Sequence, residues 1–205
     1  MINTKKDYQI YLETDRLALN RPSLTFLIRI MDFINPDYIW KFQRLLRKCE
    51  FLKNKNEQNL LTKLSYMFFK IRFKKLSLKL GFTIPENVFG PGLCILHYGT
   101  IVVNAETKIG ANCRIHACTN IGQSGGKTGA PFIGNNVYIG PGAKIYGSIK
   151  IANNVAIAAN AAVSKSFNNE NVVIGGVPAK EVGQVDIKQI IKHLNTNSQF
   201  LNKLS

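Results

Sequence analysis

The sequence contains few of the residues on which metal and disulfide sites depend. Its 205 residues include only three histidines and four cysteines. The cysteines show no C-x-x-C spacing, which favours reduced thiols in a cytoplasmic protein over a zinc or disulfide framework. A zinc site made of three imidazoles would need His97, His116 and His193 together, and His193 lies in the tail, so we expect no metal.

Long hydrophobic runs are also missing. The longest largely apolar run, 24–28, ends at Arg29, far short of the roughly 20 residues that a membrane span needs. The first 16 residues have no apolar core of the kind found in signal peptides. With 45% hydrophobic residues the chain should fold as a globular protein. We expect a cytoplasmic location, with peripheral attachment to the inner face of the membrane as a further option.

Acidic residues are scarce relative to basic ones. The chain has 27 lysines and arginines against 12 acidic residues, and residues 1–81 contain 17 of the former and seven of the latter. Such asymmetry predicts an anionic partner, either membrane headgroups or an acidic acceptor. Nucleic acid is not expected because no nucleic-acid-binding motif accompanies the charge. The residues expected to attract the partner are Arg44, Arg47, Lys48, Lys70, Arg72, Lys74 and Lys75.

A repeat of six residues dominates the second half of the chain. Aliphatic residues recur at Val103, Ile109, Ile115, Ile121, Ile133, Ile139, Ile145, Ile151, Ile157 and Val163, with one interruption in the segment 123–131. Small or β-branched residues lie two positions earlier, at Thr107, Cys113, Thr119, Val137, Ala143, Ile149, Val155 and Ala161. A period of six fits neither a single amphipathic strand nor a helix.

This repeat predicts a parallel β-helix. Short strands separated by corners would each bury one large and one small side chain, and three faces give coils of about 18 residues that are stable only when stacked. Asparagines suit such corners because they tolerate left-handed backbone; the candidates are Asn112, Asn135, Asn136, Asn153 and Asn154.

The segments "IVVNAETKIGANCRIHACTNIG" and "VIGGVPAK" give the chain a family resemblance. It resembles the hexapeptide-repeat acyltransferases, notably serine O-acetyltransferases and capsule or lipopolysaccharide O-acetyltransferases. The resemblance covers 82–184 and implies a mainly β, left-handed parallel β-helix that assembles as a homotrimer and uses acetyl-CoA. We expect this domain to follow an α-helical basic region, 1–81, and to precede a helical tail, 185–205.

The basic N-terminal region contains two apolar patterns at helical spacing. One begins at Asn35–Pro36–Asp37 and continues through Ile39, Phe42, Leu45, Leu46 and Cys49. The other comprises Leu61, Leu64, Phe68, Ile71 and Leu76, with basic residues between them. The stretch Tyr66–Lys79 is consistent with a membrane-surface helix or with a helix packed on the rest of the protein.

Histidine supplies the candidate catalytic groups. His97 and the following Ile101–Val103 match the motif that carries the catalytic histidine of serine acetyltransferases, and a neutral imidazole is a suitable general base for a hydroxyl acceptor. His116, one coil plus one position later, should lie near it as an auxiliary catalytic group or a satisfied surface residue. Tyr98 and Asn120 are candidate acceptor-binding residues.

The resemblance also implies a site for acetyl-CoA between two subunits, where small corner residues let the pantetheine arm approach the backbone. The matching residues are Gly122, Gly140, Pro141, Ala158 and Ala159, with Lys165 and Lys180 as candidate cations for the phosphates. The loop 123–131 should project from the coil and form a wall of the site.

Departures from the serine acetyltransferase pattern bear on the acceptor. Two aspartates of that family are replaced by Leu96 and Phe82, and an adjacent arginine and histidine by Gly129 and Ala130. A zwitterion needs both a cation and an anion. We therefore expect an O-acetyltransferase whose acceptor is an anionic or neutral polysaccharide or sugar precursor of capsule or lipopolysaccharide, in contact with the membrane or with capsule-assembly enzymes. Serine O-acetyltransferase with an altered acceptor pocket and a non-catalytic β-helix scaffold are the alternatives.

Overall fold

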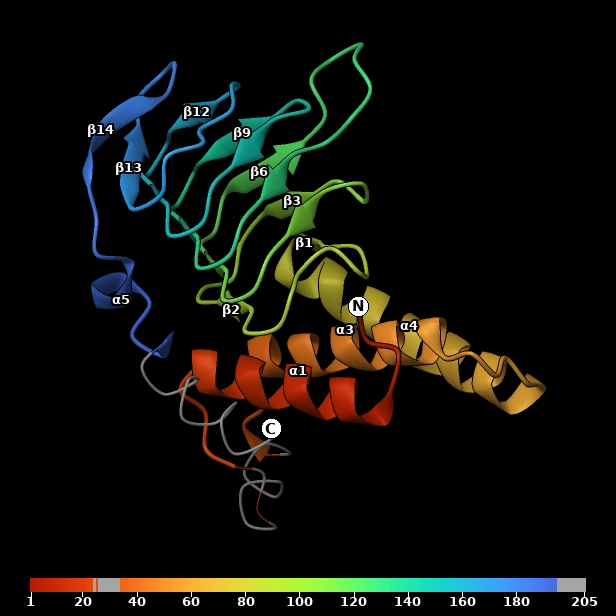
Figure 1. The fold of residues 1–205 in the computed structure, drawn as a ribbon. Coiled ribbons are helices and arrows are strands. Elements are labelled where there is room, and N and C mark those ends of the chain that lie inside the picture. The colour runs from red at the N-terminus through yellow and green to blue at the C-terminus, as the bar shows by residue number, and fades with distance from the viewer. Residues whose placement is uncertain (24, 26–33, 195–205) are drawn as a thin grey trace.

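A layer of helices lies beneath a parallel β-helix in the computed structural model, which describes residues 1–23, 25 and 34–194 (Figure 1). The helices are α1 (Lys5–Ala18), α3 (Tyr38–Asn54), α4 (Leu60–Leu80) and the short α5 (Ile187–Ile190). The strands are β1 (Phe82–Thr83), β2 (Cys94–Ile95), β3 (Ile101–Val103), β4 (Lys108–Ile109), β5 (Arg114–Ile115), β6 (Thr119–Gly122), β7 (Phe132–Ile133), β8 (Tyr138–Ile139), β9 (Lys144–Tyr146), β10 (Lys150–Ile151), β11 (Ala156–Ile157), β12 (Ala162–Val163), β13 (Val172–Gly175) and β14 (Lys180–Gln184).

Side-chain caps set the ends of the helices. The predicted helix start at Asn35–Pro36–Asp37 is confirmed, because Asp37 is the N-cap of α3 and its Oδ1 accepts a hydrogen bond from the Trp40 amide at 3.0 Å. Thr4 and Asp7 form a capping box at α1. Gly81 ends α4 in the left-handed conformation, with φ of 77°, and leads directly into β1.

Three parallel sheets form the faces of the β-helix. Sheet 1 has the order β1-β3-β6-β9-β12, sheet 2 has the order β10-β7-β4, and sheet 3 has the order β13-β11-β8-β5-β2, with β14 added antiparallel to β13. The chain visits sheets 1, 2 and 3 in turn. Ile101 pairs with Thr119, and Lys144 with Ala162, so these coils have the predicted length of 18 residues.

The interior of the β-helix confirms the repeat. All ten large aliphatic positions from Val103 to Val163 and all eight small positions between Thr107 and Ala161 are buried. Burial of one large and one small side chain per strand on every face gives a continuous apolar column, which is the main source of stability for such a stack.

Asparagine ladders hold one corner of the coil. Asn112, Asn136 and Asn154 have φ between 56° and 58°, as expected for left-handed corners. The Asn112 amide donates to Asn136 Oδ1, and the Asn136 amide to Asn154 Oδ1, each at 2.9 Å. Asn135 and Asn153 have ordinary backbone, and their side chains instead accept backbone N–H groups of the preceding coil at 2.8 Å.

A buried ionic cluster joins the helices to the first coil. The Arg47 guanidinium on α3 contacts Asp15 of α1 at 2.8 Å and Glu50 at 2.9 Å, and it donates to the carbonyls of Phe89 and Gly90. The Arg47 side chain is 0% exposed. The expectation that Arg47 attracts an anionic partner is therefore wrong, because its charge is neutralised inside the protein.

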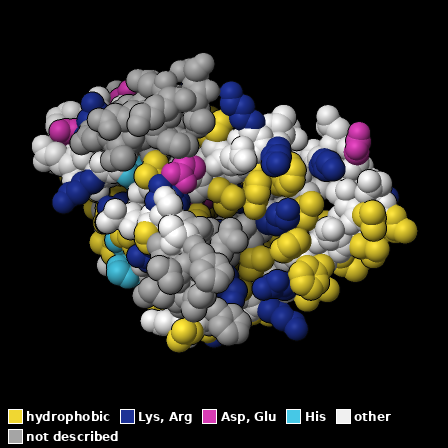
Figure 2. All heavy atoms as spheres, turned by 90° about the horizontal axis from the view of Figure 1, so that it is seen from below, with side chains coloured by type: hydrophobic (Ala, Val, Ile, Leu, Met, Phe, Trp, Pro, Cys, Tyr) yellow, Lys and Arg dark blue, Asp and Glu magenta, His cyan; other side chains and the backbone are white. Residues whose placement is uncertain are grey.

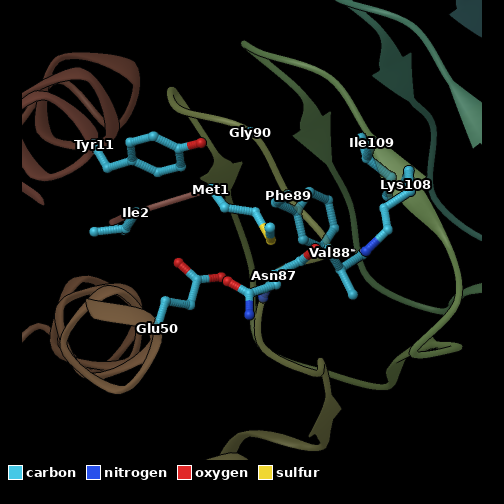
Figure 3. Close-up of a pocket in the computed structure, with 10 residues that line it drawn as sticks. All are labelled: Met1, Ile2, Tyr11, Glu50, Asn87, Val88, Phe89, Gly90, Lys108 and Ile109. Carbon is cyan, nitrogen blue, oxygen red and sulfur yellow. Dashed lines mark hydrogen bonds between the residues drawn. The ribbon is translucent and has the colours of Figure 1, made fainter. Parts of the chain in front are cut away.

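A cavity of about 160 Å³ lies beside this cluster (Figure 3). Tyr11 reaches it from α1, Glu50 from α3, and Lys108 and Ile109 from β4. Glu50 is already engaged there, because its Oε1 accepts the Asn87 amide at 2.8 Å. None of the histidines lines this cavity. We therefore interpret it as a packing cavity at the interface between the helices and the β-helix and not as a catalytic site.

The two N-terminal apolar patterns differ in their burial. Ile39, Phe42, Leu45, Leu46 and Cys49 of α3 are buried, as are Phe73, Leu76 and Leu80 of α4. By contrast, Leu61, Leu64, Phe68 and Ile71 of α4 are all more than half exposed. The packed-helix interpretation of 66–79 therefore holds for only one face of α4.

Candidate active site

One edge of the β-helix, where strands of sheet 3 turn toward sheet 1, brings several of the predicted site residues together. Ile95, Ile115, Ile139, Ile157 and Ile174 pair in register along sheet 3. The residues that follow them, Leu96, His116, Gly140, Ala158 and Gly175, therefore occupy equivalent positions of successive coils. We call this line, with the next residue of each coil, the histidine edge.

His97 and His116 lie side by side at the start of the histidine edge. Their ring centroids are 5.8 Å apart, and His97 is exposed while His116 is partly buried. Because Cys94 pairs with Arg114, the coil here has 20 residues instead of 18, and His97 aligns with Ala117. A coil of 18 residues would have aligned His97 with Ile115, the residue before His116. His116 is thus one position short of exact alignment, not one beyond it, but the predicted proximity is confirmed.

The surroundings of His116 disfavour its charged form. Burial is the main cause that lowers its pKa below the ordinary value, and the positive charge of Arg114, joined by that of His97 whenever His97 is protonated, adds to the effect. The ring packs edge-on against Tyr138 at 5.2 Å. Its Nε2 is buried and has no hydrogen-bond partner among the described residues. His116 therefore has a buried ring nitrogen whose hydrogen-bonding capacity is not used by the described residues.

Small residues line the histidine edge beyond the histidines. The Gly140 amide donates to the Ile157 carbonyl, and the Ala158 amide to that of Ile174, each at 2.8 Å. A Cβ at Gly140 would lie only 2.7 Å from the backbone nitrogen of Ala159. Pro141 and Ala159 are exposed. This part of the edge thus presents backbone and small side chains to solvent, which suits the approach of an extended ligand.

The other predicted cofactor residues are divided between two edges. Lys180 begins β14 and pairs with Gly175, at the far end of the histidine edge. Gly122 instead ends β6 and Lys165 follows β12, and both strands belong to sheet 1. The chain turns toward sheet 2 at this edge, which is also where the loop 123–131 projects (Figure 1). Within one chain, Gly122 and Lys165 are therefore on a different edge from His97. Asn120 lies on β6 with an exposed side chain.

A cavity of about 470 Å³ opens between the N-terminal region and His97. From the histidine edge it is lined by Leu96, His97 and Tyr98, whose side chain is 61% exposed. From the N-terminal region it is lined by Arg21, Asn35, Pro36, Asp37 and Ile39. The predicted general base and one predicted acceptor residue therefore share a cavity with the helices.

This cavity contains a cation and an anion. Arg21 Nε lies 2.5 Å from Asp37 Oδ2, and the two side chains are 43% and 26% exposed. The end of α1 positions Arg21, because its amide donates to the Arg16 carbonyl and its own carbonyl accepts from the Arg16 guanidinium. Capping of α3 positions Asp37. Sequence analysis missed this pair because Arg21 appeared only as a part of the net charge and Asp37 only as a helix start.

His193 is closer to the coils than the sequence suggested. Its Nε2 lies 3.4 Å from Asn112 Oδ1, and burial, with the nearby Arg114 charge, lowers its pKa to about 4. Across residues 1–23, 25 and 34–194, no three His, Cys, Asp or Glu side chains form a group that could hold a metal ion.

Comparison with known proteins places these features in context. The family described as "Bacterial transferase hexapeptide (six repeats)" matches residues 130–165. The chain is 36% identical over 102 residues to a serine acetyltransferase of Mycobacterium tuberculosis, a match that covers 49% of this chain and 44% of the relative. A serine acetyltransferase of Staphylococcus aureus is 36% identical over 106 residues, with 51% and 49% covered. The matches thus span about half the length of these curated relatives.

Solved structures extend the similarity to the helices. The crystal structure of serine acetyltransferase from Brucella abortus strain S19 has a TM-score of 0.68 and 25% identity, covering 89% of this chain and 72% of that one. The structure of the same enzyme in complex with coenzyme A has a TM-score of 0.66 and 26% identity, covering 88% and 70%.

These findings contradict the polysaccharide or sugar acceptor, and with it the role in capsule biosynthesis, that the sequence led us to expect. That inference considered charged groups only at positions matching the family motif, whereas the cavity at His97 has a cation and an anion from the N-terminal region. The chain is a helix-preceded parallel β-helix that resembles the hexapeptide-repeat acyltransferases, and within them the serine acetyltransferases.

Proposed function

We propose that the protein transfers an acetyl group from acetyl-CoA to the hydroxyl of serine, with His97 as the general base. The observation that carries this proposal is the cavity that unites an exposed imidazole with an ion pair, Arg21 and Asp37. The similarity to serine acetyltransferases, one of them in complex with coenzyme A, supports both the donor and the acceptor.

The acceptor site has the charges that a zwitterion needs. Arg21 would donate to the carboxylate of serine, and Asp37 would accept from its ammonium group, because charge-assisted hydrogen bonds of this kind are the strong ones. The serine hydroxyl would then point toward His97, which lines the same cavity. The charged side chains of the acceptor pocket would thus come from the N-terminal region instead of the β-helix.

The reaction needs one proton acceptor. His97 takes the proton of the serine hydroxyl as its oxygen attacks the thioester carbonyl carbon. The tetrahedral intermediate then loses the CoA thiolate, which takes the proton from His97, so the products are O-acetylserine and CoA. Burial lowers the pKa of His116, which disfavours a second positive charge beside His97.

Acetyl-CoA would lie along the histidine edge. Gly140, Pro141, Ala158 and Ala159 would leave room for the pantetheine arm, and Lys180 would supply charge for the phosphates. A second wall must come from another copy, and a homotrimer provides one. Gly122, Lys165 and the loop 123–131 lie on a different edge, from which they would reach the histidine edge of a neighbouring subunit.

Acceptor analogues test this function. Release of the CoA thiol should be measured with purified protein, acetyl-CoA and serine, serinol or N-acetylserine, since serinol lacks the carboxylate and N-acetylserine lacks the ammonium group. We expect kcat/KM for each analogue to fall at least about tenfold below that for serine, since each loses one charge-assisted bond. Equal use of serine and serinol would contradict a zwitterion site, and absence of thiol release with every acceptor would contradict an enzyme.

A further inference from the structure

Helix α4 has two apolar faces, and among the described residues only one of them is buried. Successive residues of a helix turn by 100°. Phe73, Leu76 and Leu80 lie on the face that packs on the protein. On the opposite side, within an arc of about 120°, lies the set Leu60, Leu61, Leu64, Met67, Phe68, Ile71 and Leu78, with exposed fractions between 53% and 78%. We call this second set the outer face of α4.

The outer face is bordered by positive charge. The sequence of α4 contains Lys63, Lys70, Arg72, Lys74, Lys75 and Lys79 and no acidic residue. Figure 2 shows exposed hydrophobic side chains with lysines and arginines among them on the side of the molecule where α4 lies in Figure 1. Only Lys70 is neutralised by an ion pair within the described part of α4, through Glu86 of the first coil.

A basic hollow adjoins the outer face. An open cavity of about 250 Å³ between α3 and α4 is lined by Lys41, Arg72, Lys75 and Lys79, together with Tyr38, Leu45 and Leu76. None of its lining residues is acidic. Four cations around an apolar floor are suited to phosphate groups, with the lysine and arginine stems covering the hydrophobic surface.

We propose that α4 docks the protein on the surface of a bilayer containing anionic phospholipids. The outer face would enter the boundary between headgroups and acyl chains, and the flanking cations would contact the phosphates. A second copy of α4 suits this face less well, because it would bring another six basic residues against these six. None of the helices in the described part of the chain is long and apolar enough to cross a membrane.

This docking is independent of the proposed acetyl transfer, so the two can be tested separately. The full-length protein should be sedimented with vesicles of phosphatidylcholine alone and with vesicles containing phosphatidylglycerol, at low and high salt. We expect binding to the anionic vesicles only, weakened by salt because surface charges are screened over about 10 Å at 0.1 M.

Two variants and a control identify the surface. Lys74→Glu with Lys75→Glu should weaken vesicle binding at least about 30-fold, since each lysine near an anionic surface contributes about fivefold and each new carboxylate is repelled. Phe68→Gln with Ile71→Gln should weaken it at least about tenfold through lost apolar insertion. The control variant, Lys150→Glu with Lys188→Glu, changes the net charge by the same amount at exposed positions outside α4. It should bind the vesicles as the wild type does.

Three outcomes would overturn the proposal. The first is equal binding of the wild type to neutral and anionic vesicles. The second is a loss of vesicle binding in the control variant as large as that in the α4 variants. The third is no vesicle binding by the wild type. If the wild type does not bind and Phe68→Gln with Ile71→Gln lowers the mass measured by light scattering, the outer face joins copies of the chain instead.

Discussion

Removing one charge from the cavity at His97 should weaken the use of serine in a way that depends on the acceptor. Asp37→Asn is a clean change because asparagine caps a helix as well as aspartate does, so α3 should keep its start. Arg21→Gln removes the cation at the end of α1, where the side chain is 43% exposed. Loss of their mutual ion pair should cost at most about 1 kcal/mol of stability.

The size of the effect follows from the exposure of the two groups. A hydrogen bond to a charged group contributes about 1.5–3 kcal/mol. Because Arg21 is partly solvated, the lower end applies, and about 1.4 kcal/mol corresponds to a tenfold change. We therefore expect either variant to lower kcat/KM for serine about tenfold, mainly through KM, since these groups would hold the substrate in both the ground state and the transition state.

Serinol provides the internal comparison for these kinetics. It lacks the carboxylate, so Arg21→Gln should leave its kcat/KM nearly unchanged, whereas Asp37→Asn should lower it as it does for serine. Steady-state thiol release with both acceptors measures all four values. An equal loss for serine and serinol in Arg21→Gln, or no loss for serine in either variant, would refute the assignment of the pair to the acceptor.

Three further changes test other parts of the account. Gly140→Ala should raise KM for acetyl-CoA in thiol-release assays and lower the melting temperature, because its Cβ would lie 2.7 Å from the Ala159 nitrogen; unchanged values would contradict the close stacking of the histidine edge. Arg47→Ala should cost about 3–5 kcal/mol in denaturant unfolding, because Asp15 and Glu50 would remain buried without their cation. The free energy of unfolding should fall as the pH is lowered from 6.5 towards 4, because His193 binds a proton more readily in the unfolded chain. His193→Gln should reduce that fall by roughly 2 kcal/mol, as measured by denaturant unfolding at each pH. An equal fall in the variant would contradict the burial of His193.

The repeat made most of the fold predictable. The burial of each repeat position from Val103 to Val163 can be predicted from the sequence, because the period of six places each of them in the same local environment. This prediction needs no knowledge of contacts between distant parts of the chain. The proximity of His97 and His116 followed from the same regularity. The exact alignment did not, because the coil from Cys94 to Arg114 contains 20 residues rather than 18.

Contacts between the helices and the coils were not predictable in this way. Arg21 and Asp37 are separated from His97 by 76 and 60 positions in the sequence. They line the same cavity as His97 only because α1 and α3 dock on the first coil. Arg47 looked like any other basic residue on a helix, and its burial depends on carboxylates from both α1 and α3. On α4 apolar residues occupy two opposite faces, so the pattern alone could not say which one the protein covers.

The most direct test of the central claim is the formation of O-acetylserine from acetyl-CoA and serine, measured by mass spectrometry, with wild-type protein and His97→Asn. The account predicts one O-acetylserine for each CoA released by the wild type. It predicts a rate about 10²–10⁴-fold lower in the variant, with acetyl-CoA binding retained, because a general base contributes that much. Wild-type protein that forms no O-acetylserine, or a variant within a few-fold of the wild-type rate, would contradict it.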